Sequence, residues 1–96
     1  MTTEEMRVEI SSDKGRSGHI IFSEGIHFLQ FEYELCGPGD TVATIPVPSE
    51  SSWDSQIPWA AERRSSVLSF IASEVIRQKS PSSSFNLGDR FIWILA

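Results

Sequence analysis

Two histidines and one cysteine are the residues of this chain best suited to metal binding. His19 and His27 flank a turn, and the expected hairpin places them diagonally on one sheet face. A structural zinc ion needs four ligands, and a catalytic one needs three and a water. Cys36 lies nine residues past His27 and at best reaches the far end of the sheet, and no CxxC, HxxxH or HExxH spacing occurs. The sequence therefore predicts no metal site and favours ordinary strand histidines.

The sequence also gives little support for a catalytic nucleophile or for a pair of acid–base residues. Cys36 precedes a Gly-Pro-Gly turn, with no helix N-terminus expected nearby to activate a thiolate. Glu32 and Glu34 project from one strand face, but an open face lacks the burial that separates two carboxylates into an acid and a base. The segment CGPGD lacks the spacing and the Lys-Ser/Thr ending of a phosphate loop. We expect a protein that is not an enzyme, with no catalytic residue and no cofactor.

Length and composition indicate one globular domain over residues 1–96. Of the 96 residues, 40% are hydrophobic and 22% are charged, which is typical of a soluble domain. No apolar run approaches the roughly 18 residues of a membrane helix, and the acidic start MTTEEM does not suggest a signal peptide. The single Cys36 offers no internal disulfide. These features predict a cytoplasmic protein without membrane association.

Charge is distributed unevenly along the chain. Residues 1–54 hold ten acidic and three basic residues, which gives −7, whereas residues 55–96 hold three acidic and five basic residues, which gives +2. Because an acidic surface repels phosphate backbones, we expect no nucleic-acid binding. The same surface suits a basic protein partner, although acidic residues also keep a small domain in solution.

The first half of the chain has the alternation of β-strands. Strands are expected at 7–10, 19–22, 26–35 and 41–47, with Pro46 making the end of the last strand an edge. The segment 23–25 suits a three-residue hairpin loop with Gly25 left-handed, which places Phe22 opposite Ile26. Within 26–35, one face is apolar and is expected to meet a helix. The other face carries Glu32 and Glu34.

Residues 57–79 form the one strong helical pattern. Asp54 or Ser55 is the expected N-cap, Pro58 suits the first turn, and Pro81 cannot continue the helix. A final strand at 90–95 is apolar on both faces and is expected to be central in the sheet or else covered by a partner, with Trp93 in the core. The sequence thus predicts an α+β domain: a mainly antiparallel sheet of four to five strands with one long helix on one face. The helical stripe that covers the sheet is Ala60, Ala61, Val67, Leu68, Ile71, Ala72, Val75 and Ile76.

Several residues of the helix depart from this stripe. Trp59 and Phe70 are expected on the opposite side of the helix, among arginines, where large aromatics often anchor an interface. The alternative is that a terminal loop folds over them. Arg64 falls inside the stripe and is expected either to extend its guanidinium to solvent or to pair with an acid of the sheet. The predicted partner-binding residues are Trp59, Arg63, Phe70, Arg77, Glu32 and Glu34.

With these elements placed, the chain resembles the small immunity proteins of bacterial polymorphic toxin systems. The resemblance covers residues 18–79: short strands, then Trp53 in a loop, Pro58, Glu62-Arg63 and the apolar run Val67-Leu68-Ile71 of one long helix. It implies a cytoplasmic, non-enzymatic protein that binds a cognate toxin and occludes its active site. It carries over no individual site residue.

Three functions are therefore open at this point. The first is an immunity or inhibitor protein that binds one protein partner, such as a basic toxin domain. The second is a homo-oligomeric structural domain, in the simplest case a homodimer, whose aromatic and β surfaces pair with copies of themselves. The third is a small enzyme or ligand-binding domain with a pocket between sheet and helix. The sequence favours the first.

Overall fold

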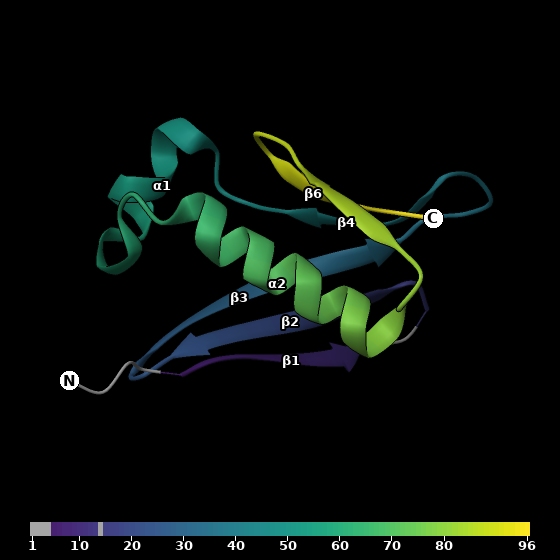
Figure 1. Cartoon of the computed structure of the whole chain (residues 1–96), viewed down its shortest axis with the longest axis horizontal. Helices are drawn as coiled ribbons and strands as arrows, with labels where there is room; N and C mark the ends of the chain where they lie inside the picture. The colour runs from purple at the N-terminus through teal and green to yellow at the C-terminus, as the bar shows by residue number, and fades with distance from the viewer. Residues whose placement is uncertain (1–4, 14) are drawn as a thin grey trace.

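Six antiparallel strands form one sheet, and a long helix lies across one of its faces (Figure 1). The computed structural model describes residues 5–13 and 15–96. The strand order is β1-β2-β3-β4-β6-β5. The α+β class and the long helix on one face are confirmed, but the sheet has six strands rather than four or five. The elements are β1 (Met6–Ser12), β2 (Ser17–Glu24), β3 (His27–Leu35), β4 (Thr41–Pro46), α1 (Glu50–Gln56), the 3₁₀ turn η1 (Pro58–Ala60), α2 (Arg64–Lys79), β5 (Ser84–Leu87) and β6 (Phe91–Leu95).

The extra strand is β5, at the edge of the sheet beside β6. The turn-forming residues around Asn86 and Gly88 suggest an irregular approach to the last strand, and the run is only four residues long. Phe85 and Leu87 nevertheless alternate, and both pack against the core. β6 lies between β4 and β5, so its expected interior position is confirmed.

The β2–β3 hairpin turns more tightly than the sequence suggests. Glu24 pairs with His27, which leaves Gly25 and Ile26 as a two-residue turn, and Gly25 has the expected left-handed φ of 62°. Phe22 therefore lies opposite Leu29 instead of Ile26. This register is the one that buries Phe22, because a shift of one residue would turn its side chain to the outer face.

The predicted helix 57–79 is wrong in its first third. Residues 50–60 form α1 and η1, and the chain then breaks at Ala61, whose ψ is 140°, and Glu62, whose φ is 63°. Asp54 is not an N-cap of the long helix; its carboxylate accepts a hydrogen bond from the Glu62 N–H at 2.8 Å. The break lets Trp53 lie 1% exposed against the core, where its Nε1 donates to the Ala60 carbonyl at 2.8 Å.

The inner face of the sheet and the buried face of α2 make one apolar core. Pro81 follows the end of α2 as expected, and no helix in the described part of the chain is long and apolar enough to cross a membrane. The apolar face predicted for 26–35 does turn toward the helix, with Phe31 at its centre. Fully buried members of the core are Ile20, Phe22, Ile45, Trp53, Ala60, Val67, Leu68, Ile71, Ala72, Ile92 and Ile94.

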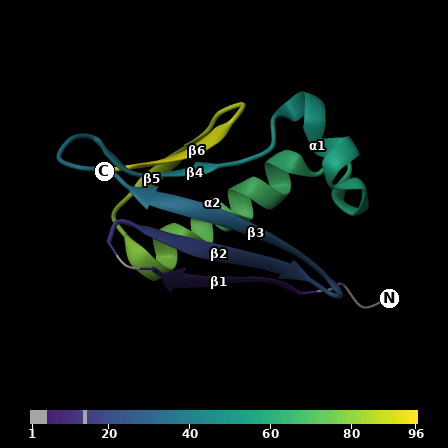
Figure 2. The ribbon, with the colours of Figure 1, turned by 180° about the vertical axis from the view of Figure 1, so that it is seen from behind.

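Pro46 lies at the end of an interior strand instead of on an edge strand. β4 sits between β3 and β6, yet its pairing with β3 is confined to Glu34 with Thr44 and Leu35 with Ala43 among the described residues. Beyond these pairs the two strands diverge, as the view from behind shows (Figure 2). A proline lacks the N–H that a ladder needs. The expected loss of pairing at Pro46 therefore occurs, but inside the sheet.

Candidate functional site

The two histidines lie on opposite faces of the sheet, so the expectation that they share a face is wrong. In the observed register His19 pairs with Glu32 on the outer face, and its Nδ1 lies 2.9 Å from an Asp13 carboxylate oxygen. His27 is on the inner face, stacked on Trp59 with ring centroids 4.5 Å apart. Cys36 is exposed and in neither neighbourhood. Within residues 5–13 and 15–96, no three metal-binding side chains come together.

Trp59 and Phe70 do not point away from the sheet. Trp59 belongs to η1, because the long helix has not yet begun, and its ring stacks near Phe22 with centroids 6.4 Å apart. Phe70, on α2, meets Phe22 edge to face at 6.1 Å. Both are half-buried and packed against the core. Their contact with a partner stays a prediction, confined to the parts of each ring that remain exposed.

The two candidate arginines are each held by a carboxylate of the same chain. Arg63 donates two hydrogen bonds of 2.8 Å to Glu24 at the end of β2. These bonds hold the pKa of the Glu24 carboxyl below its usual value. Arg77 makes a similar pair with Glu74 one helical turn away. Trp59, Arg63 and Phe70 thus gather at the hairpin end of the sheet, whereas Arg77 lies near the C-terminal end of α2.

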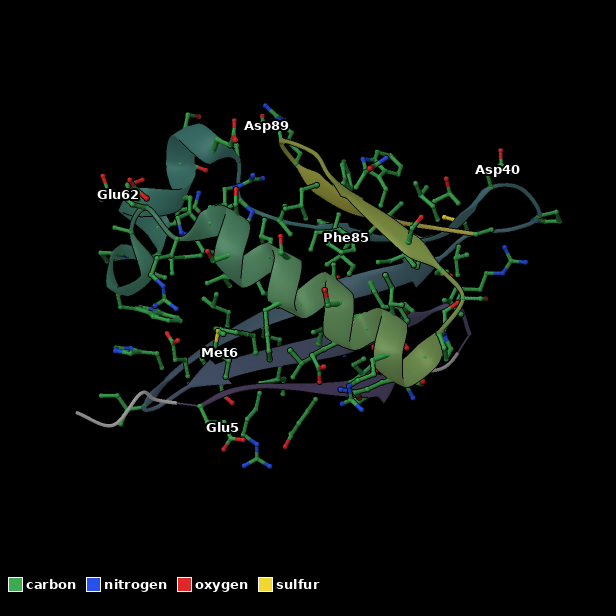
Figure 3. The ribbon with its side chains drawn as sticks, viewed as in Figure 1. Glu5, Met6, Asp40, Glu62, Phe85 and Asp89 are labelled. Carbon is green, nitrogen blue, oxygen red and sulfur yellow. The ribbon has the colours of Figure 1, made fainter. Side chains whose placement is uncertain are left out.

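Arg64 does not extend to solvent, and among the described residues its ion-pair partner is Glu50 of α1, at 3.9 Å, instead of an acid of the sheet. It is 8% exposed and donates to three backbone carbonyls, those of Pro48, Gly88 and Asp89, at 2.8–3.0 Å. Asp89, at the β5–β6 turn in Figure 3, in turn accepts from the Glu50 N–H at 3.0 Å. One guanidinium therefore ties the start of α1 to the tip of the β5–β6 hairpin. The signal for this role in the sequence was the position of Arg64, a charged residue, within the apolar stripe of the helix.

The outer face of β2 and β3 combines exposed acidic and apolar side chains. Glu32 and Glu34 are exposed there, as expected from the alternation of 26–35. Phe28, on the same face, is 67% exposed, and Ile21 on β2 is 38% exposed. We call these four residues the outer patch. Ile26, at the adjoining turn, is 90% exposed.

Trp93 also lies on the outer face, which corrects its expected place in the core. It is 39% exposed and contacts Phe91 with ring centroids 5.4 Å apart. Its neighbours Ile92 and Ile94 point inward and are fully buried. The alternation within FIWIL was the signal, but a run that is apolar at every position does not say which set is inside.

A cavity of about 270 Å³ lies between the sheet and the C-terminal end of α2. Its lining is mainly apolar, and its polar side chains include Tyr33, Ser12 and Lys79. The Tyr33 hydroxyl and the Ser12 Oγ lie 3.2 Å apart. The sequence raised such a pocket only as an alternative. The remaining lining residues are Ile10, Leu35, Val42, Ala43, Ile45, Val75, Ser80 and Ile94.

Comparison with known proteins gives no relative for this arrangement. No protein-family model, curated protein or solved structure matches the chain. The likeness to immunity proteins therefore stays a prediction. The features of the chain that bear on function are the outer patch, the cavity and the acidic strands.

Proposed function

We propose that this domain is a non-enzymatic protein-binding module whose outer patch contacts a basic partner. The observation that carries the proposal is the combination of Phe28, 67% exposed, with the exposed carboxylates of Glu32 and Glu34 on one strand face. An exposed aromatic offers buried area to a partner, and a neighbouring charge gives orientation and specificity. In its finer form, the module is a cytoplasmic bacterial immunity protein that occludes a toxin.

The position of the acidic residues supports a basic partner. Glu9 on β1 lies opposite Ile21, so a third carboxylate joins those of β3 on this face. The whole chain has a net charge of −5. Such a field accelerates encounter with a basic surface and is screened by salt, with a Debye length that shortens from about 30 Å at 0.01 M to about 8 Å at 0.15 M.

The test is affinity capture from the native host, followed by binding kinetics with the protein that co-purifies. Glu32→Lys with Glu34→Lys should slow association more than it speeds dissociation, and the wild-type on-rate should fall as salt rises. Asp40→Lys with Glu62→Lys is the matched control, because it makes the same charge change at two exposed sites at opposite ends of the domain (Figure 3). If both double variants slow association equally, the outer patch is not the contact.

A second candidate function is the binding of a small amphipathic anion in the cavity. The apolar lining would receive a hydrocarbon chain, and Lys79 is the cation among the lining residues. Octanoate is a suitable probe, and it should raise the melting temperature of the wild type more than that of Lys79→Gln. An equal shift in the two proteins, or none, would contradict this role.

A further inference from the structure

The two edges of β3 carry different sets of backbone groups. The Leu35 N–H donates toward β2, to the Arg16 carbonyl, whereas the Cys36 N–H donates toward β4, to the Val42 carbonyl at 2.9 Å. Because the direction alternates along a strand, odd-numbered residues of β3 face β2 and even-numbered ones face β4. The backbone groups on the β4 side upstream of Glu34 are those of Phe28, Gln30 and Glu32.

Among the residues that the structure describes, no strand pairs with these groups. The β3–β4 register, continued by two residues, would place Pro46 opposite Glu32 in a hydrogen-bonded pair. Pro46 has no N–H to donate, and the recorded pairing stops at Glu34 with Thr44. Across residues 5–13 and 15–96, neither a strand pairing nor a turn or loop hydrogen bond reaches Phe28, Gln30 or Glu32 from this side. An open strand edge of this kind is a template for another extended chain.

The space beside this edge is a groove and is not filled by side chains. Its volume is about 640 Å³. It is lined by residues of β3 and of the end of β4, the two strands that diverge in Figure 2. Phe31 and Ile57 line it while being 7% and 6% exposed, so they present small apolar areas at its base. The full lining is Leu29, Gln30, Phe31, Glu32, Pro46, Val47, Pro48, Gln56 and Ile57.

We propose that an extended, basic segment of a partner protein adds a strand to the open edge of β3 in this groove. Such a segment would alternate, with apolar side chains toward Phe31 and Ile57 and lysine or arginine side chains toward Glu32 and Glu34. The inference rests on the protein-binding function proposed above and names its mode. A second copy of this chain is a poorer occupant, because its net charge of −5 repels the same acidic edge.

Amide hydrogen exchange tests the edge and the occupant together. The probe is an acetylated and amidated heptapeptide in which lysine and valine alternate. In the free protein, the amides of Phe28, Gln30 and Glu32 should exchange rapidly while those of Leu29, Phe31 and Tyr33 are protected. The peptide should slow the exchange of the amides of Phe28, Gln30 and Glu32 at least about tenfold, which corresponds to a stabilisation of roughly 1.4 kcal/mol. A control peptide of the same composition, with all its lysines at one end, should not slow the exchange of these amides.

Two outcomes of that experiment would overturn the proposal. One is that the even-numbered amides are already protected in the free protein, which would mean that the edge is closed. The other is that both peptides protect the same amides equally, or that neither does, which would remove the alternating basic strand as the occupant.

Gln30→Pro and Gln30→Ala form a matched pair for the same edge. Gln30 directs its N–H into the groove, so proline should leave the β2–β3 ladder intact and the domain folded. It should weaken the alternating peptide at least about tenfold, because a donor is lost and the ring fills space needed by the incoming strand. Gln30→Ala should bind as the wild type does. Equal binding by both variants, or unfolding of the proline variant alone, would contradict an open edge.

The same pair separates this inference from the function on which it rests. A natural partner that is slowed by Glu32→Lys with Glu34→Lys, yet binds Gln30→Pro and Gln30→Ala equally, uses the outer patch without adding a strand. In that case the protein-binding function stands and the strand addition is wrong. A partner that ignores all of these substitutions contradicts both.

Discussion

The corner around Arg64 and the groove between β3 and β4 both adjoin α1. Backbone polar groups at the corner are hydrogen-bonded within the chain, whereas those at the groove are open to a partner. At the corner, one guanidinium satisfies the carbonyls of Pro48, Gly88 and Asp89, and Trp53 donates to the Ala60 carbonyl. At the groove, no strand in the described part of the chain pairs with the β3 edge upstream of Glu34. A buried polar group without a partner costs about 1–3 kcal/mol, so a fold closes such groups unless they can meet water or a ligand.

This difference separates residues that hold the fold from residues that can bind. Arg64 and Trp53 are types often found in interfaces, yet both are engaged inside the chain. Gln30 and Glu32 have exposed side chains, and it is their backbone N–H and C=O groups, on the open edge of β3, that can bind a partner strand. Substitutions at the corner should therefore change stability, and those at the groove should change binding.

The largest expected effect on stability is the difference between a buried tryptophan, Trp53, and a partly exposed one, Trp93. Trp53→Ala should lower the free energy of unfolding by about 3–5 kcal/mol, because it empties a fully buried site and leaves the Ala60 carbonyl without its donor. Trp93→Ala, at a residue 39% exposed, should cost less than half as much. Urea denaturation of both variants measures the difference, and equal losses would mean that the outer face is covered.

The next effect concerns Arg64 itself. Arg64→Leu should cost about 3 kcal/mol, since it keeps the apolar stem but leaves three carbonyls without a donor. It should also detach the β5–β6 turn, which faster amide exchange in residues 84–95 would report. Arg77→Leu is the matched control on the exposed side of α2, where no comparable loss is expected. A stable Arg64→Leu protein with unchanged exchange would show that the corner closes by other contacts.

The smallest effect is the pH dependence of the pair between Glu24 and Arg63. Because hydrogen bonds from Arg63 lower the pKa of Glu24 in the folded state, the pair stabilises the fold above the usual value of 4.5, and this contribution is lost as pH falls through the lowered pKa. Arg63 is 40% exposed, so we expect at most about 1 kcal/mol.

Denaturation at several pH values measures this contribution. The difference in unfolding free energy between the wild type and Glu24→Gln should be largest near pH 7 and shrink below about pH 4.5. A difference that grows as the solution becomes more acidic would have the wrong sign for this pair.

The apolar periodicity of the sequence was sufficient to predict much of the architecture. The alternation of Leu29, Phe31 and Tyr33 identified the inner face of β3, and the stripe around Leu68 identified the buried face of the long helix. Gly25 at the hairpin and Pro81 after the helix were correct for local reasons, since each residue restricts its own backbone. These signals depend only on residues close together in the chain.

The candidate site was less predictable. Glu32 and Glu34 lie on the outer face as expected, whereas Trp59 and Phe70 pack on Phe22, which lies 37 and 48 positions earlier in the chain (59 − 22 and 70 − 22). A helical projection cannot foresee the contact of Trp59 with Phe22, because the helix does not extend back to Trp59. The break at Glu62 is itself tertiary: the Asp54 carboxylate and the buried Trp53 stabilise a left-handed residue that local propensity disfavours.

The sequence by itself determined five of the six strands, most of the long helix, and the apolar faces of β3 and α2, because these properties follow from local spacing. The tertiary structure alone decided the register of the β2–β3 hairpin, the three carbonyls that Arg64 joins, and the divergence of β4 from β3. Pro46 shows where local sequence information ends and tertiary structure is needed. Its missing N–H was evident from the sequence, but only the strand order places that gap inside the sheet, beside an open edge, because strand neighbours are chosen by contacts between residues far apart in the chain.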